Sequence, residues 1–269
     1  KTVLTIALEQ AQRHESYLTG LCPLELLMPP DPGLIQGERP DFITFDYISQ
    51  LVETRARERA GAVETEFREA LRCSGLRGDW QCPAGVFTNV VAERLRTADL
   101  GIIGQADPDT RIGRMARAMV EETVLWSGRP VLAIPFAGRF GTIGKNVLIA
   151  WRNTREAARA INDALPLIDR DANVTVLSVQ PPRESEEDAL PTADVAEHLA
   201  RHGLNATAAR TVNDGSISDA DAILNYAADI GADLLVAGCY GHSRAREMIL
   251  GGVSRGLLRR MTLPVLLSH

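Results

Sequence analysis

Two short motifs occur twice in this chain at a fixed distance, and this repeat limits the possible folds more than any other feature. Residues 98–104 (ADLGIIG) resemble residues 232–238 (ADLLVAG), 134 positions later. Residues 129–132 (RPVL) resemble residues 263–266 (LPVL) at the same separation of 134. Two separate motifs that share one separation are hard to obtain by chance. The sequence therefore predicts two copies of one fold.

Short apolar segments alternate with amphipathic stretches in both copies. In the first copy we expect strands at residues 3–5, 17–21, 79–83, 100–103 and 131–134, and helices at residues 6–12, 45–73, 88–97 and 111–125. In the second copy we expect strands at residues 147–151, 174–179, 206–212, 234–237 and 264–267, and helices at residues 154–168, 193–201, 218–230 and 252–261. This order is typical of an α/β protein with two Rossmann-like domains, each a parallel five-stranded sheet with helices on both faces.

The domain boundary is predicted where three glycines lie close together in a stretch with little apolar content. Residues 138–145 are expected to be a linker between domain 1 (residues 1–137) and domain 2 (residues 146–269). The first copy is short between its first two strands, where a crossover with its helix needs about 10–12 residues. Either this loop is trimmed or residues are missing after Thr5, and the lack of a turn residue between Thr5 and Ile6 favours missing residues. The proline-rich insertion at residues 23–44 is either an exposed loop or a lid or docking arm.

The composition excludes several classes of partner and location. The 269 residues carry a net charge of −6, which argues against a nucleic-acid surface as the main function. No apolar run approaches the roughly 20 residues that span a bilayer, and no signal peptide opens the chain. The four cysteines lack CxxC pairs or zinc-ligand spacing, so we expect reduced thiols in a cytoplasmic protein.

The strongest candidate for a binding site follows the predicted strand at residues 234–237. Its glycines have the spacing Gly238-x2-Gly241-x9-Gly251-Gly252, and Val253 and Ser254 open the next predicted helix. A strand, a glycine-rich turn and a helix N-terminus in this order can hold a phosphate, because backbone N–H groups point toward the anion. The alternative is that the glycines only make turns and the serine only caps a helix.

This spacing resembles the signature G-x2-G-x9-G-(S/T) of the ATP-binding branch of the universal stress protein family, and the resemblance extends over both copies. It implies the adenine nucleotide alpha hydrolase-like fold and a cytoplasmic stress-response protein that binds ATP or AMP, with or without magnesium. The adenine and ribose would lie near Ala150, Val179 and Ala237. The phosphates would lie on Gly241, Gly251, Gly252, Val253 and Ser254, next to Gly238.

The chain departs from the family pattern at several positions. Arg152 stands where an aspartate commonly ends the first strand, and Gly252 stands where the family has Ser or Thr. An arginine can pair with phosphate but cannot accept hydrogen bonds as a carboxylate does. The first copy lacks the glycines altogether, with Asp107 and residues 121–125 (EETVL) in their place. Its acidic residues would repel phosphate, so we interpret domain 1 as a scaffold.

Two further functions stay open. The chain could be an interaction protein without bound nucleotide, both sites being degenerate, or an ATP-consuming enzyme of similar fold. No catalytic Ser/His/Asp order or carboxylate pair stands out, so we expect at most a slow ATPase. His198 and His202 are four apart on a predicted helix, which is more typical of a solvated face than of a metal site. The strands at residues 131–134 and 265–267 are expected to pair, giving an intrachain pseudo-dimer, with a homodimer as a further option.

Overall fold

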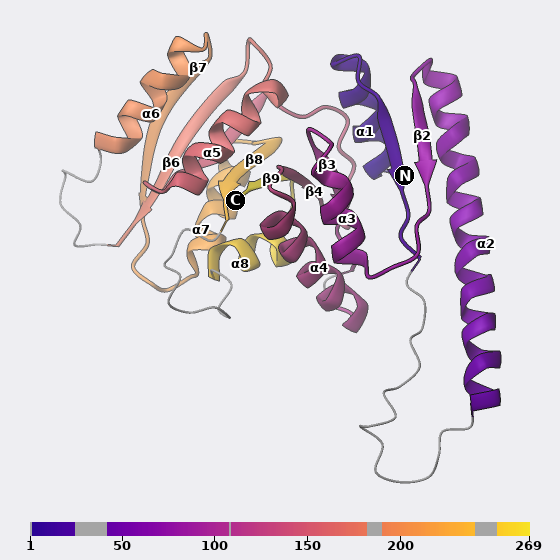
Figure 1. Cartoon of the computed structure of the whole chain (residues 1–269). Helices are drawn as coiled ribbons and strands as arrows, with labels where there is room; N and C mark the ends of the chain where they lie inside the picture. Colours follow the sequence, from indigo (N-terminus) through magenta and orange to yellow (C-terminus); the bar gives the residue numbers. More distant parts are fainter. Residues whose placement is uncertain (1, 25–41, 108, 182–189, 240–251) are drawn as a thin grey trace. The chain divides into compact units, whose positions relative to one another are not determined.

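A computed structural model describes residues 2–24, 42–107, 109–181, 190–239 and 252–269 (Figure 1). Contacts divide the chain into two compact units, residues 1–6 with 94–269 and residues 7–93. The larger unit contains the main sheet, and the smaller unit contains a two-stranded sheet and a long helix. None of the helices in these described ranges is long and apolar enough to cross a membrane.

The helices and strands follow the predicted order closely. The helices are α1 (Thr2–Arg13), α2 (Phe42–Ser74), α3 (Phe87–Leu95), α4 (Arg111–Ser127), α5 (Arg155–Ala164), the 3-10 turn η1 (Leu165–Leu167), α6 (Leu190–Arg201), α7 (Asp219–Asp229) and α8 (Gly252–Arg260). The strands are β1 (Leu18–Leu21), β2 (Gly78–Gln81), β3 (Gly101–Gly104), β4 (Val131–Ile134), β5 (Asn146–Ala150), β6 (Asn173–Gln180), β7 (Asn205–Val212), β8 (Leu234–Gly238) and β9 (Val265–Ser268).

The prediction of a strand at residues 3–5 is wrong, because these residues lie in the uninterrupted helix α1. Val3 and Thr5 are β-branched and favour a strand locally. However, Ile6, Gln10 and Ala11 are buried, and a spacing of four to five residues places them on one side of a helix. Tertiary burial thus overrides the local preference. Missing residues after Thr5 stay a prediction.

The main sheet has seven strands among the described residues, in the order β3-β4-β9-β8-β5-β6-β7. Strands β4 and β9 pair, as the sequence predicts, and the structure shows that they are antiparallel, with Leu132 opposite Leu266. All other neighbours in this sheet are parallel. The second half therefore has five parallel strands, β5 to β9. The described part of the first half adds β3 and β4 to this sheet and has β1 and β2 in a separate one, so the predicted five-stranded sheet is not found there.

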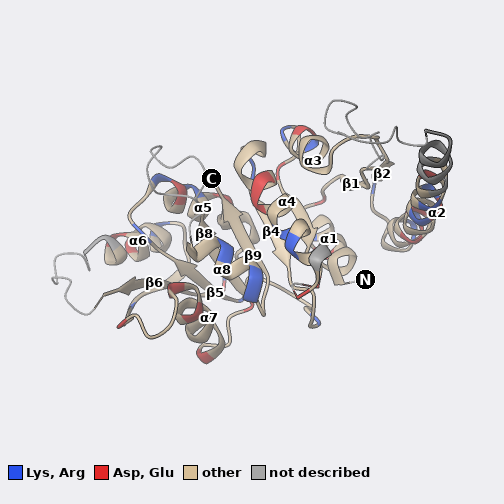
Figure 2. Cartoon of the chain, turned by 90° about the horizontal axis from the view of Figure 1, so that it is seen from below, with Lys and Arg blue, Asp and Glu red and all other residues tan. Residues whose placement is uncertain are grey.

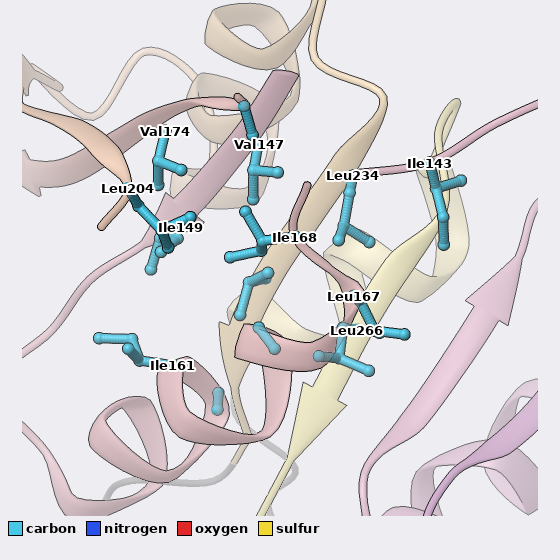
Figure 3. Packing of buried hydrophobic residues seen from close by; sticks show 14 of the residues in the cluster. Ile143, Val147, Ile149, Ile161, Leu167, Ile168, Val174, Leu204, Leu234 and Leu266 are labelled. Carbon is cyan, nitrogen blue, oxygen red and sulfur yellow. The ribbon is translucent and has the colours of Figure 1, made fainter. Parts of the chain in front are cut away.

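The core of the larger unit lies between the sheet and the helices α5 and α6. Strands β4 and β9 are buried at every residue, as is expected for strands that are covered on both faces. In Figure 3 the side chains of Val147, Ile149, Leu234 and Leu266 come together from three strands, near Ile161 of α5. On the opposite face α7 and α8 pack against each other. This core fixes the strand ends that form the candidate site.

The start of β5 is fixed by a carboxylate from the repeated ADL motif. Asp233 accepts hydrogen bonds from the backbone N–H groups of Gly144, Lys145 and Asn146, at 2.8, 3.0 and 3.2 Å. Ile143, immediately before these residues, is buried in the core of the larger unit. The end of the segment predicted as a linker is therefore tied to the second half, while the domain boundaries at residues 137 and 146 stay a prediction.

The smaller unit is built on β1 and β2, which pair in parallel with Leu18 opposite Gly78. Helix α2 packs on this sheet through Phe67, whose ring centre lies 5.6 Å from that of Trp80. Gly20 leaves the space that Trp80 occupies, since a Cβ atom there would overlap the indole ring. The contact between Phe67 and Trp80 thus helps to hold the two-stranded sheet against the long helix α2.

Candidate functional site

The strand order of the second half places a crevice at the carboxyl ends of β5 and β8. The chain runs from β5 to β6 and β7 on one side, and β8 and β9 lie on the other side of β5. In open parallel sheets, ligands bind where the strand order reverses in this way. Ala150 ends β5 and lies opposite Ala237 of β8, next to Gly238. Three of the residues predicted for the site therefore meet at this point.

Of the other predicted residues, two lie near this point and two lie outside the described residues. Arg152 follows β5 and is exposed to solvent. Val179 is half-buried near the end of β6, one strand farther away, where it pairs with Thr211 of β7. Gly241 and Gly251 belong to residues 240–251, which lie outside the described part of the chain. The roles of Gly241 and Gly251 in the site therefore stay a prediction.

Helix α8 begins at Gly252 with the three remaining candidates in its first turn. Gly252 is exposed, Val253 is half-buried and Ser254 is buried. The first backbone N–H groups of any helix have no partner within the helix, and the helix dipole adds about half a positive charge there. The N–H groups of this turn are thus suited to an anion. Arg259 and Arg260 lie in the last turn of the same helix, where the ribbon is blue in Figure 2.

The Ser254 side chain has a partner within the protein. It lies beside the thiol of Cys239, which is buried directly after β8. Burial raises the pKa of the Cys239 thiol to about 12, so the group stays neutral and is unsuited to act as a nucleophile. The sequence could not show this contact, because it joins Cys239, at the end of a strand, to a helix that begins 13 residues later. Ser254 thereby fastens α8 to β8.

Gly238 has a packing role that the sequence does not reveal. A Cβ atom at this position would overlap the backbone nitrogen of Ala157 and lie 2.6 Å from the carbonyl carbon of Glu156. The first turn of α5 therefore packs directly on the end of β8. Gly252 differs, because a Cβ atom there meets no atom within 4 Å. The fold requires a glycine at Gly238 but not at Gly252.

A buried carboxylate lies close to the strand ends. Glu156 is in the first turn of α5 and forms an ion pair with Arg155. Burial, its largest influence, raises the pKa of Glu156, but hydrogen bonds from Arg155, the backbone and Thr154 outweigh it and lower the pKa overall. The ionised carboxylate is also stabilised by the helix N-terminus. The charge near the crevice is therefore mixed, with exposed Arg152 as a cation free to meet an anionic ligand.

Sequence reasoning missed a pocket of about 440 Å³ between α5 and α6. It is lined by Trp151, Asn153, Ala158, Ile161, Asn162, Asp194, Val195 and His198. The ring of His198 also meets that of His202 edge to face, with centres 4.8 Å apart. Among the described residues no group of His, Cys, Asp or Glu is arranged to hold a metal ion. The sequence pattern did not indicate this pocket, because it forms between two helices that are separated in the sequence by β6.

The first half contributes a buried acid at the joint between the two halves. Glu121 of α4 is only 1% exposed, and its Oε1 lies 3.5 Å from Nε of Arg117. Burial raises the pKa of Glu121, and Arg255 of α8 and Arg117 offset this only in part. From the sequence, Glu121 was expected to repel phosphate at the carboxyl end of the sheet. The structure instead buries it near α8.

Replacing Glu121 with glutamine is expected to stabilise the protein at neutral pH. The pKa of Glu121 is higher in the folded protein than in the unfolded chain, so protonation of this carboxyl stabilises the fold. This stabilisation is fully present below the pKa of the unfolded chain and is lost as the pH rises through the pKa of the folded protein. Removing the buried charge should raise the free energy of unfolding by about 1 kcal/mol at pH 7 and leave it nearly unchanged at pH 4.

Chemical denaturation of wild type and Glu121→Gln at both pH values measures this difference. Glu122→Gln is the matched control, because it makes the same change one residue along on a half-buried side chain. An equal gain at pH 4 and pH 7 would show that the charge of Glu121 is not the cause.

Residues 144–269 match the universal stress protein family. A segment of 46 residues is also 41% identical to the universal stress protein Slr1230 of Synechocystis sp.. That segment covers 17% of this chain and 16% of the relative, so the chain matches only about one sixth of the relative's length. This family match does not extend to residues 1–137, so the other predicted universal stress protein domain, domain 1, stays a prediction.

Solved structures share the fold over nearly the whole chain. A universal stress protein from Archaeoglobus fulgidus has a TM-score of 0.69 at 17% identity, over 99% of this chain and 90% of its own. The functionally unknown protein PA1789 from Pseudomonas aeruginosa has a TM-score of 0.55 at 15% identity, over 96% of this chain and 94% of its own. At these identities the likeness concerns the fold alone. The α/β, Rossmann-like fold of universal stress proteins thus describes this chain.

Proposed function

We propose that the second half of the chain binds an adenine nucleotide, ATP or AMP, in the crevice between the carboxyl ends of β5 and β8. The observation that carries this proposal is the convergence of Ala150, Ala237 and Gly238 at the point where the strand order reverses. Residues 144–269, which match the universal stress protein family, include both of these strands. The adenosine would lie near Ala150, Val179 and Ala237. The phosphates would meet the glycine turn and the backbone N–H groups of α8.

The charged groups suggest how the ligand would be held. Exposed Arg152 can donate two hydrogen bonds to a phosphate, and the first turn of α8 can donate backbone N–H groups. A magnesium ion bound with the nucleotide would neutralise part of the phosphate charge and lessen its repulsion from Glu156. We assign no general base, so any ATP hydrolysis would be slow. We further propose a cytoplasmic stress-response protein, in which the first half acts as a scaffold.

A substitution at Gly252 separates ligand binding from folding. In the free protein Gly252→Asp should be tolerated or slightly stabilising, because its side chain enters open space and an acid at a helix N-terminus stabilises the helix by about 0.3–1 kcal/mol. The same charge would repel a phosphate, so the affinity for ATP should fall by about tenfold or more, which is 1.4 kcal/mol. Stability and affinity are thus expected to change in opposite directions.

Calorimetric titration with ATP, ADP and AMP at up to millimolar concentration, with and without magnesium, measures the affinity. Gly141→Asp is the matched control, since it adds the same charge at an exposed glycine with no atom near its Cβ position. Binding by the wild type that is lost only in Gly252→Asp supports the site. Equal binding by both variants would place the nucleotide elsewhere, and no binding by the wild type would reject the proposal.

One observation favours the second candidate, an interaction protein that binds no nucleotide. The hydroxyl of Ser254 is buried against Cys239 instead of facing a ligand. Under this alternative the glycines would serve only helix packing, as Gly238 does against α5. The same titration decides between the two candidates, because only the first one predicts heat of binding from ATP or AMP.

A further inference from the structure

Two cysteines occupy facing positions at the ends of β1 and β2 in the smaller unit. The parallel register pairs Leu21 with Gln81, and Cys22 and Cys82 are the next residues on the two chains. The pairing continues past them, because Leu24 forms a parallel bridge with Ala84. The two cysteines are therefore enclosed by paired backbone on both sides.

Backbone hydrogen bonds hold the two segments in this register. The Cys22 N–H donates to the carbonyl of Gln81 at 2.9 Å, and the Leu24 N–H donates to that of Pro83 at 2.9 Å. Neighbouring strands lie about 4.8 Å apart, and disulfides form between residues whose Cα atoms are about 4.4–6.8 Å apart. The backbone spacing thus suits a disulfide without a change of fold.

The side chains meet each other and can be reached from solvent. The Cys22 thiol lies close enough to that of Cys82 for Cys82 to raise its pKa. Cys82 is exposed and Cys22 is half-buried, and both are reduced in this structure. Burial is the main cause that raises the pKa of Cys22, followed by its proximity to Cys82. The exposed Cys82 is therefore the thiol that an oxidant meets first.

We propose that Cys22 and Cys82 form an oxidation-sensitive dithiol, which hydroperoxides convert into an intramolecular disulfide between β1 and β2. The Cys82 thiolate attacks one oxygen of the hydroperoxide, the O–O bond breaks, and an alcohol or water leaves, so that Cys82 becomes a sulfenic acid. The Cys22 sulfur then attacks the Cys82 sulfur, the S–O bond breaks, and water leaves with the Cys22 proton. Two thiols lose two electrons and the hydroperoxide gains them.

The other two cysteines lack this arrangement. Cys73 lies on α2, and its thiol donates to a carboxylate oxygen of Glu69 at 3.5 Å. Cys239 is 1% exposed in the larger unit. A reducing cytoplasm keeps most thiols reduced, and cytosolic disulfides are usually transient and redox-sensing. A facing, accessible pair of cysteines is the arrangement that such a sensor needs. This inference concerns the smaller unit and does not depend on nucleotide binding.

Thiol counting in denaturant before and after brief hydrogen peroxide treatment tests the proposal. The wild type should fall from four free thiols to two, and a non-reducing peptide map should join the peptides of Cys22 and Cys82. Dithiothreitol should restore four. Cys73→Ser, the control, should fall from three to one. Cys82→Ser should keep three, and its exposed position makes serine a mild change.

Circular dichroism of each variant shows whether it is folded, and the oxidised wild type should keep the spectrum of the reduced protein. Four thiols after peroxide treatment would overturn the proposal. A cross-link that includes Cys73, or one between two chains, would overturn it as well. Loss of two thiols in Cys82→Ser would show that this pair is not the reactive one.

Discussion

Gly238→Ala is expected to lower the free energy of unfolding by about 3 kcal/mol, because the new methyl group has no space. It would overlap the backbone nitrogen of Ala157 and crowd the carbonyl carbon of Glu156. Backbone atoms cannot rotate away as a flexible side chain can. Helix α5 would have to move, although Ala157 and Ala160 hold it in the core. Urea denaturation followed by circular dichroism measures the loss.

The control is the same substitution at the other end of the candidate site. Gly252→Ala places its methyl group in open space at the start of α8, and alanine favours a helix over glycine by up to about 1 kcal/mol. It should therefore leave stability unchanged or raise it slightly. If Gly238→Ala proves as stable as Gly252→Ala, α5 does not pack on the end of β8 as described.

This contrast shows how far the sequence could predict the site. The alternation of strands and helices predicted a parallel sheet, and the family resemblance implied that Ala150 and Ala237 lie near the same ligand; the structure pairs these two residues. The sequence pattern did not show that Gly238 and Gly252 differ in their packing, because a glycine has no side chain to indicate its role. One is required by a helix that crosses it, and the other is open to solvent. Only the packing of α5 distinguishes them.

The same limit explains what the sequence missed elsewhere. The pairing of β4 with β9 was predicted, because two apolar edge strands can pair, and the structure shows that it is antiparallel. By contrast, residues 3–5 are too few for their pattern to separate strand from helix, and burial of Ile6 and Gln10 decides for the helix. Burial of Glu121 beside α8 likewise depends on how two distant helices meet. Local patterns specify elements, and contacts between helices are set by three-dimensional packing.

The second large effect is expected from Gly144→Ala, just before β5. Gly144 has a φ angle of 97°, which disfavours any residue with a side chain, and a Cβ atom would overlap the carbonyl oxygen of Leu167. Its N–H also donates to Asp233 at 2.8 Å, so the backbone cannot turn away without losing that hydrogen bond. Backbone strain of about 1–3 kcal/mol together with the overlap should cost about 3 kcal/mol or more of the free energy of unfolding.

Gly141→Ala is the matched control, three residues earlier in the same segment. Gly141 is exposed, and its Cβ position has no atom within 4 Å. The free energies of unfolding of the two variants, measured by chemical denaturation, should therefore differ by about 3 kcal/mol. That of Gly141→Ala should lie within about 0.5 kcal/mol of the wild type. Similar small effects in both would mean that this segment behaves as the free linker that its glycines suggest. A loss confined to Gly144→Ala would instead make residues 143 and 144 the first fixed part of the second half, anchored by the aspartate of its ADL motif.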